Sequence, residues 1–205
     1  GIDIQRMLAC IDRYSPESLL LVPELLRVLV ASVAKGWRAP ANLKFIAVGG
    51  ASVSAELLTA AHAVGLPAYE GYGLSECASV VALNSPAAAL KGSVGRVLPH
   101  ARIRIDAAGE IHVRGATMSG YLGNDEQTQT EVATGDLGFI DADGFLHVRG
   151  RRKNLLITSL GRNVSPEWVE RELLASDSIS QAVVFGEAKP FLSCLIYPTS
   201  PTVSA

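Results

Sequence analysis

The sequence predicts an α/β protein in which a parallel α/β layer is followed by a β-rich hairpin subdomain and the start of a small α+β C-terminal domain. Three observations carry this prediction. Up to residue 90, short apolar runs alternate with segments whose apolar residues have helical spacing. In residues 91–151, apolar and polar residues mostly alternate one by one, as in strands. Residues 152–205 combine helix and strand patterns. We expect these to be three parts of the chain, the last of them incomplete.

In the first part, apolar strands lead into helices. Residues 18–22 form a short apolar run that Pro23 stops, and proline suits the first turn of a helix because its missing N–H needs no partner there. Residues 43–48 predict a second strand, Ser54 a helix N-cap, and residues 68–71 a third strand. Strands that alternate with helices favour a parallel sheet.

The middle part is predicted to consist of two similar hairpins. Residues 101–105 alternate strictly, with arginines expected outward and isoleucines inward, and a turn follows at residues 106–109. The sequence of residues 109–115 nearly recurs at residues 144–150. Two copies do not make a repeat array, so we interpret them as antiparallel hairpins in a small barrel or curled sheet.

The last part opens with a basic cluster and continues as a helix and two strands. Ser165 and Pro166 predict a helix start, with a capping serine and a proline at the first helical position. Residues 179–185 and 192–197 predict strands.

Composition excludes several function classes. The 205 residues are 48% hydrophobic and 19% charged, with a net charge of -2, which allows a core but no electrostatic grip on nucleic acid. Residues 19–34 are apolar but contain charges and fall short of the ~20 residues of a transmembrane segment. Cys10, Cys77 and Cys194 lie far apart, so neither a structural zinc site nor a disulfide framework is expected, and a reducing, cytoplasmic setting is simplest.

The richest chemistry lies in residues 69–76 (YEGYGLSE) and in the preceding 49–52 (GGAS). We expect both to be loops after parallel strands, where α/β sheets bind ligands. Tyr72 offers a flat face for a base, Ser75 a hydroxyl for phosphate, and Glu76 a hard oxygen for Mg²⁺. Taken alone, a tight turn with a capping serine explains the segment equally well.

Two further segments are weaker signals when taken singly. Residues 134–137 (TGDL) place a carboxylate after a glycine turn, where it could bind two ribose hydroxyls, although a solvated turn is the commoner explanation. The basic run at residues 150–154 would ordinarily be solvated surface. Its place at an expected boundary favours a hinge or an anion contact.

Together these segments resemble the adenylate-forming superfamily of acyl-CoA synthetases, luciferases and peptide-synthetase adenylation domains. The series is GGAS, YGLSE, KGSVGRVLP, GEIHVRG, SGYLGN, TGDLG and GRRKNLLITSLGRNVSPEWVE. The resemblance covers nearly the whole chain, from about residue 18 to residue 197. Its last element is most similar to the branch that acts on longer fatty acids. The resemblance implies activation of a carboxylic acid, here a fatty acid, by ATP and Mg²⁺ to acyl-AMP, followed by transfer to coenzyme A.

The resemblance also implies a role for each matching residue. Those that would line the nucleotide and acyl-adenylate pocket are Gly49, Gly50, Ala51, Glu70, Gly71, Tyr72, Gly73 and Ser75. Glu76 would bind Mg²⁺, and Asp136 would hold the ribose hydroxyls with Arg151 nearby. Lys153 falls at the hinge before the lid domain, and Gly161 belongs to the loop that approaches for the thioester step. Residues 1–90 and 91–151 would then be parts of the large adenylation core.

Two family elements are absent from the chain. The Ser/Thr/Gly-rich phosphate loop, normally upstream of YGLSE, has no counterpart, and neither has the adenylation lysine, whose motif Lys189 does not fit. We therefore expect no catalytic residue within the chain. The chain opens at Gly1 without a methionine or a signal sequence, so we expect a fragment that is inactive alone.

Other function classes remain open at this point. Residues 73–77 (GLSEC) begin like a nucleophile elbow but lack its second glycine. The possible bases are His62, His100, His112 and His147, of which the two on alternating strands are expected to face solvent. A non-catalytic binding module is disfavoured by the retained Glu76 and Asp136. The runner-up among enzymes is an acyl-AMP ligase, or an adenylation domain serving a carrier protein. The acid, its chain length and the oligomeric state stay undecided.

Overall fold

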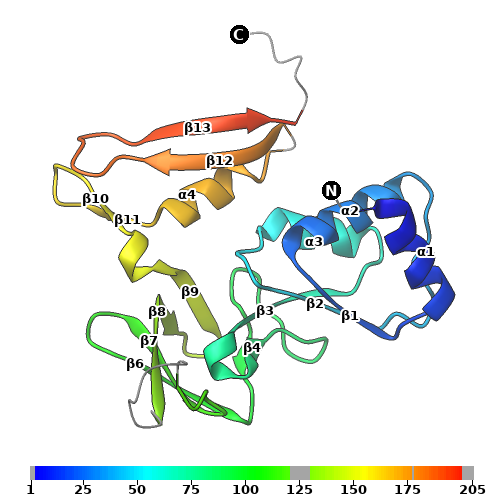
Figure 1. The fold of residues 1–205 in the computed structure, drawn as a ribbon, viewed down its shortest axis with the longest axis horizontal. Helices are drawn as coiled ribbons and strands as arrows, with labels where there is room; N and C mark the ends of the chain where they lie inside the picture. The colour runs from blue at the N-terminus through cyan, green and yellow to red at the C-terminus, as the bar shows by residue number, and fades with distance from the viewer. Residues whose placement is uncertain (1–2, 121–129, 177, 200–205) are drawn as a thin grey trace.

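The computed structural model describes residues 3–120, 130–176 and 178–199, which form three successive groups of elements (Figure 1). The first group contains a five-stranded sheet in the order β1-β2-β3-β4-β5. Its first three strands, β1 (Ser18–Leu21), β2 (Phe45–Val48) and β3 (Ala68–Leu74), are parallel. Strands β4 (Ser79–Leu83) and β5 (Arg96–Val97) continue the sheet antiparallel. The predicted parallel α/β layer is confirmed.

Three helices belong to this group: α1 (Ile4–Tyr14), α2 (Pro23–Ala34) and α3 (Ala55–Ala63). Pro23 starts α2, and the Ser54 hydroxyl accepts a hydrogen bond from a backbone N–H in the first turn of α3, both as predicted. Helix α1, capped by Asp3, has no counterpart in the sequence prediction. The core between helices and sheet includes Leu26, Leu29, Ile46, Val48 and Leu66. Each large side chain buried there contributes about 1.5–3 kcal/mol.

The segment expected to be a ligand-binding loop after the third strand is largely strand. β3 continues to Leu74 and pairs with β4, and only residues 75–77 form a short 3₁₀ turn. The glycines here are needed for packing between strands. A Cβ on Gly73 would lie 1.5 Å from the Ser79 carbonyl oxygen, and one on Gly71 would lie 2.7 Å from Leu83 Cδ1.

The middle group is a four-stranded antiparallel sheet of β6 (Ala101–Ile105), β7 (Glu110–Gly115), β8 (Glu131–Ile140) and β9 (Leu146–Arg151). The two predicted hairpins are present, with Ile111 and Leu146 fully buried. Residues 134–137 were expected between the hairpins as a turn. They lie inside β8, because this strand is ten residues long and reaches from one hairpin into the other.

The last group follows a short 3₁₀ turn, η2 (Arg152–Asn154). Its elements are β10 (Leu156–Ile157), β11 (Asn163–Val164), α4 (Pro166–Leu173), β12 (Ile179–Phe185) and β13 (Ser193–Pro198). The helix starts at Pro166 with Ser165 as its N-cap residue, as predicted, but the Ser165 side chain makes no capping hydrogen bond. Its hydroxyl instead donates to Glu167 Oε2 at 2.9 Å. Among the helices of the described residues, none combines the length and the apolar content that crossing a bilayer requires.

Candidate functional site

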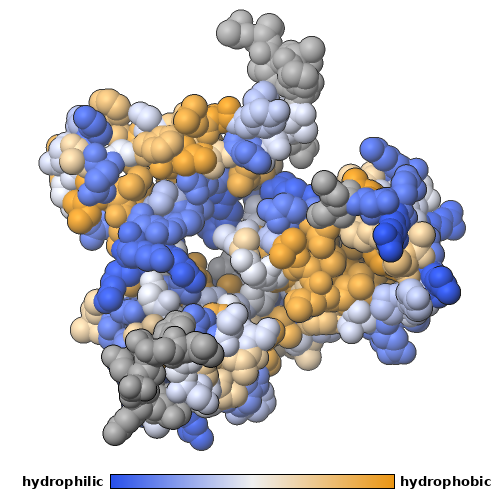
Figure 2. Space-filling view, viewed as in Figure 1, coloured by the Kyte–Doolittle hydropathy of each residue, from blue (hydrophilic) through white to orange (hydrophobic). Residues whose placement is uncertain are grey.

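A cavity of about 360 Å³ lies where the three groups meet. Its walls come from the β2–α3 loop, β3, β8, β9 and α4. This volume falls within the range of roughly 300–1,000 Å³ that small-molecule sites occupy. Figure 2 shows mainly hydrophilic side chains where the last group faces the rest of the chain. The position, beyond the carboxyl ends of parallel strands, is where α/β sheets bind ligands.

Most of the predicted nucleotide-site residues line this cavity. They are Gly50, Ala51, Glu70, Gly71, Tyr72, Gly73, Asp136 and Arg151. Gly49 is not in the lining and packs against β3, where a Cβ would lie 3.1 Å from the Gly71 carbonyl oxygen. Ser75 and Glu76 lie on the 3₁₀ turn after β3 and do not line the cavity. Lys153 and Gly161, farther along the chain, are also outside the lining. The structure thus gathers the residues expected to contact base and ribose and leaves those expected to contact phosphate and metal, and the expected hinge residue, apart.

Asp136 is fixed at the edge of the cavity by three groups. The Tyr72 hydroxyl donates to Asp136 Oδ2 at 2.7 Å, and Arg151 Nε lies 2.9 Å from Oδ1. The backbone N–H of Asp136 donates to Thr134 Oγ1 at 3.0 Å. The carboxylate side chain is only 7% exposed, whereas that of Arg151 is 48% exposed. A carboxylate carries about four acceptor positions, so Asp136 retains capacity for hydroxyl donors from a ligand.

Tyr72 lines the cavity, and its hydroxyl donates to Asp136. Burial raises the pKa of Tyr72 far above its usual value, and the neighbouring Asp136 carboxylate adds to this increase. The phenol therefore stays protonated and remains a donor at all physiological pH values. Its ring offers a flat apolar surface on which an aromatic ligand can stack.

Glu70 brings a buried carboxyl group to the same cavity. Burial raises the pKa of Glu70 to about 7, although the backbone N–H of Val53 and the positive charge of Arg171 oppose this increase. The Val53 nitrogen lies 3.5 Å from Glu70 Oε1. Near neutral pH the Glu70 carboxyl group is consequently ionised in part of the molecules, where it only accepts hydrogen bonds, and protonated in the rest, where it can also donate one.

Helix α4 covers the cavity from the side of the last group. Trp168, Arg171 and Glu172 line the cavity, and Arg171 Nη1 donates to Ser52 Oγ in the β2–α3 loop at 3.3 Å. The Arg27 Nη2 donates to the carbonyl oxygen of Leu174 at 3.4 Å. The sequence analysis missed these α4 residues as site residues. Their spacing, which places positions 168, 171 and 172 on one helix face, is the signal that could have identified them.

The positions expected to form the hinge and the thioester-step loop are separate from the cavity in this arrangement. Lys153 lies in η2, directly after β9, and Gly161 lies in the turn between β10 and β11 with φ at +72°. The left-handed backbone there suits glycine. Helix α4, not this turn, faces the cavity.

Glu76 fits a magnesium ligand by chemistry, because Mg²⁺ prefers carboxylate oxygens and coordinates one or two of them alongside substrate phosphates. It sits half-buried on the turn at the end of β3, where its backbone carbonyl oxygen accepts from the Met118 N–H at 2.8 Å. Next to it, burial raises the pKa of Cys77 to about 11, with the charge of Glu76 adding to the effect. Cys77 is therefore a thiol that packs in the core and no nucleophile.

The structure does not support a serine hydrolase. Within the described part of the chain, the histidine rings bond elsewhere and not to Ser75: to backbone carbonyl oxygens of Ala68, Val80 and Gly92, and to the carboxylates of Asp106 and Asp141. The sequence prediction that the two strand histidines face solvent is also wrong. The side chains of His112 and His147 are only 15% and 19% exposed, because each is hydrogen-bonded to an aspartate of its own hairpin.

Comparison with known sequences gives consistent matches. The profile of the AMP-binding enzyme family matches residues 2–122, and that of the AMP-binding enzyme C-terminal domain matches residues 153–205. The long-chain-fatty-acid–CoA ligase FadD15 of Mycobacterium bovis is 44% identical over 162 residues, which are 76% of this chain and 27% of that protein. The 2-succinylbenzoate–CoA ligase of a Geobacillus species is 33% identical over 183 residues, which are 81% of this chain and 37% of that protein.

Solved structures agree with these matches. The O-succinylbenzoate coenzyme A synthetase MenE of Bacillus subtilis, in complex with AMP, superposes with a TM-score of 0.84 at 28% identity and covers 100% of this chain. This chain covers 45% of that structure, and 27% of the length of the fatty-acid ligase above, so it spans less than half of either relative. The family profile covers more than half of the chain, and the fatty-acid ligase matches three quarters of it. The chain therefore belongs to the AMP-binding enzymes of the adenylate-forming superfamily and is close to the fatty acyl-CoA synthetases.

Proposed function

We propose that this chain forms the nucleotide-binding part of an AMP-forming ligase that joins a fatty acid to coenzyme A. The observation that carries the proposal is the fixed carboxylate of Asp136, held between Tyr72 and Arg151 at the edge of the cavity. An acceptor held in this way suits a pair of vicinal hydroxyls, as the acidic residue does in dinucleotide sites. The neighbouring ring of Tyr72 suits a purine base.

The reaction has two steps that share one site. A carboxylate oxygen of the acid attacks the α-phosphorus of ATP and pyrophosphate leaves, and then the thiol of coenzyme A attacks the acyl carbon and AMP leaves. In both steps Asp136 and Tyr72 hold the nucleoside, while the Ser75 hydroxyl meets the phosphate. Mg²⁺ held by Glu76 would neutralise phosphate charge. Pyrophosphate binding and the adenylation lysine are assigned to no residue of this chain.

Between the steps, the last group of elements would rotate about Lys153. This assigns residues 1–90 and 91–151 to the adenylation core and residues 152–205 to the lid. In the described arrangement α4 covers the cavity and Gly161 lies outside it. A rotation at one or two residues could exchange the two, because hinges absorb large changes in backbone dihedral angles.

The substrate that we propose is a fatty acid, and the compartment is the cytoplasm. The choice of a fatty acid is supported by the higher identity to the fatty-acid ligase, 44%, than to the succinylbenzoate ligase, 33%. An aromatic acid is the second candidate, because structures of the latter class cover the whole of this chain. Transfer to a carrier protein would replace only the second step and would leave the nucleotide site unchanged.

Binding of AMP to the 205-residue chain, measured by calorimetry, tests the nucleotide site. A hydrogen bond to a charged group contributes ~1.5–3 kcal/mol, so Asp136→Asn should weaken AMP binding by about 10-fold or more. Asp143→Asn removes the same charge from an exposed turn and should change nothing. Wild-type protein should also prefer AMP to 2′-deoxy-AMP, and Asp136→Asn should abolish that preference. Equal binding of both nucleotides by the wild-type chain would contradict the ribose assignment.

A further inference from the structure

Glu110 is a buried carboxylate that the nucleotide site does not use. It is the first residue of β7, its side chain is 5% exposed, and it is not in the lining of the cavity. Its Oε1 accepts from the backbone N–H of Gly135 at 2.9 Å, and its Oε2 lies 2.6 Å from Arg152 Nη1. Gly135 immediately precedes Asp136, and Arg152 immediately precedes Lys153. The Glu110 side chain thus connects the residue next to Asp136 with the residue next to Lys153, the proposed pivot.

The end of β9 is held on both sides by this arrangement. Arg151 pairs with Asp136, while Arg152 pairs with Glu110. Arg151 is in an extended conformation, and successive side chains of extended backbone point to opposite sides. Each arginine therefore reaches a different buried carboxylate of the same sheet, directly before the chain leaves the sheet for the last group.

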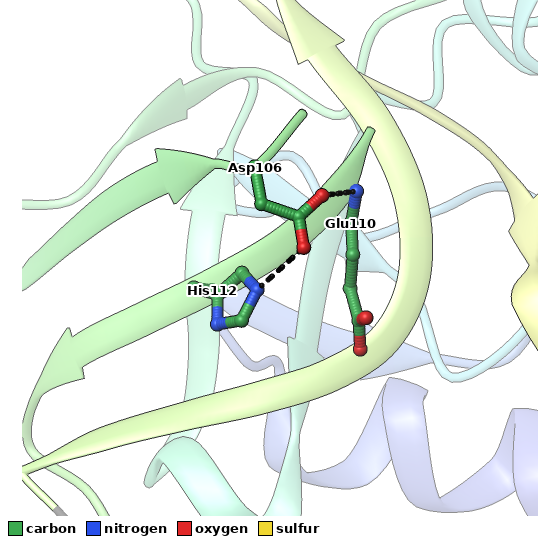
Figure 3. Close-up of side chains that lie close together, drawn as sticks. All are labelled: Asp106, Glu110 and His112. Carbon is green, nitrogen blue, oxygen red and sulfur yellow. Dashed lines mark hydrogen bonds and ion pairs between the residues drawn. The ribbon is translucent and has the colours of Figure 1, made fainter. Parts of the chain in front are cut away.

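Glu110 also belongs to a compact group with Asp106 and His112, whose ligand-type atoms lie within 4.8 Å of one another (Figure 3). Contacts within the sheet account for this group. Asp106 accepts from two backbone N–H groups of its own turn and from His112. Figure 3 shows the Glu110 carboxylate extending away from the Asp106–His112 pair, in keeping with its bonds to Gly135 and Arg152.

We propose that Glu110 and Arg152 form a positioning pair that couples the Asp136 carboxylate to the orientation of the last group of elements. The coupling rests on the proposed function, because it treats Asp136 as the nucleotide ligand and Lys153 as the pivot. Arg152 and Lys153 share the 3₁₀ turn η2, so a rotation that unwinds this turn and displaces Arg152 would leave Glu110 buried without its cation, which is unfavourable. The pair therefore favours the arrangement in which α4 covers the cavity, and nucleotide bound at Asp136 favours the same arrangement.

The chain carries natural probe sites for testing this. Cys10 in α1 and Cys194 in β13 are exposed and lie in the first and last groups, whereas Cys77 is buried. The raised pKa of Cys77 further protects it from labelling reagents. Spin labels on Cys10 and Cys194 report the orientation of the last group as a distance distribution, which pulsed electron resonance measures. The AMP affinity of the same samples reports whether Asp136 is still positioned to bind the nucleotide.

Arg152→Gln and Glu110→Gln should each broaden the distance distribution and weaken AMP binding by about 3- to 10-fold. Because both changes break one interaction, the double variant should be no worse than either single variant. Arg102→Gln removes an exposed arginine from β6 and should leave both readouts at wild-type values. Arg152→Lys restores the charge and should recover most of the narrow distribution, which a general loss of stability would not allow. If Arg152→Gln fails to fold, Arg152→Lys can still be compared with Glu110→Gln.

Each outcome has a defined meaning. A distance distribution for Arg152→Gln that matches Arg102→Gln would overturn the proposal, and so would a broadened distribution with unchanged AMP affinity. Fully additive losses in the double variant would overturn it as well. Failure of the wild-type chain to bind AMP would count against the proposed function, and the distance distributions would then decide the role of the pair separately.

Discussion

The two hairpins of the middle sheet begin from nearly the same sequence and perform different tasks. Residues 106–115 read DAAGEIHVRG, and residues 141–150 read DADGFLHVRG. Their turns match in backbone conformation and in the burial of the strand that follows. Gly109 and Gly144 have φ of +83° and +82°, and the apolar residue two positions later is fully buried in both.

The hydrogen bonds of the two turns match as well. In each, Oδ1 of the aspartate accepts the backbone N–H groups two and four residues later, at 2.9 and 2.8 Å in the first hairpin and 3.0 and 2.9 Å in the second. Oδ2 faces Nε2 of the histidine six residues later, at 3.2 and 2.8 Å. The pattern Asp-x-x-Gly-x-x-His therefore specifies this turn by itself.

The difference between the hairpins lies in the residue that follows the glycine. In the first hairpin this is Glu110, which bonds Gly135 and Arg152. In the second it is Phe145, which is 7% exposed and lies under the guanidinium of Arg96 at 4.9 Å. One position thus connects one hairpin to the segment of β8 that carries Asp136 and the other to β5. Local sequence determines the turn, and the next side chain determines its use.

Truncation of Phe145 should give the largest effect on stability. Phe145→Ala removes a buried aromatic ring, so the free energy of unfolding in urea should fall by about 3–5 kcal/mol. AMP affinity of the folded protein should stay unchanged, in contrast to Glu110→Gln. Phe191→Ala, at a ring that is 62% exposed, is the matched control and should cost far less. Equal losses at both positions would show that the second hairpin does not contribute a packing residue.

The same contrast explains what could be predicted from sequence. Strands, hairpins and most helix starts follow from local patterns, and the cavity residues of β3 follow from the family motif. The length of β8 depends on pairing with β7 on one side and β9 on the other, and the strand character of residues 71–74 depends on pairing with β4 across the turn at residues 75–77. Neither pairing is encoded in the pattern of the segment itself. The α4 residues Trp168 and Arg171 reach the cavity only because the last group docks there. The bond between Glu110 and Arg152 has the same tertiary origin.

Substitution of the turn glycines should give an intermediate effect, equal in the two hairpins. Gly109→Ala and Gly144→Ala each place a side chain on left-handed backbone, which costs about 1–2 kcal/mol. Neither new Cβ would meet another atom within 4 Å, so no clash adds to this cost. Ala107→Ser, at an exposed turn position, should change the free energy of unfolding by less than about 0.5 kcal/mol. A clear difference between the two glycine variants would mean that the turns are not equivalent.

The smallest effect should come from the turn aspartates, and it should distinguish the two turns. The backbone N–H of Glu110 is the main cause of the lowered pKa of Asp106, with His112 second, whereas His147 is the main cause for Asp141. Both carboxylates ordinarily titrate near 3.8. Because the folded-state pKa is lowered, the stabilisation is complete above the ordinary, unfolded-state pKa near 3.8 and is lost as pH falls through the lower folded-state pKa.

Asparagine keeps an oxygen for the backbone N–H groups but removes the negative charge that faces the histidine ring. Asp141→Asn should therefore lower the urea midpoint at pH 7 more than Asp106→Asn, since histidine is the main partner of Asp141 and a backbone N–H is the main partner of Asp106. Unfolding midpoints measured from pH 7 down to about pH 2 should converge with wild type in acid, where the aspartates are protonated. A larger loss for Asp106→Asn, or a difference from wild type that persists undiminished in acid, would show that charge at these turns is not what separates the two hairpins.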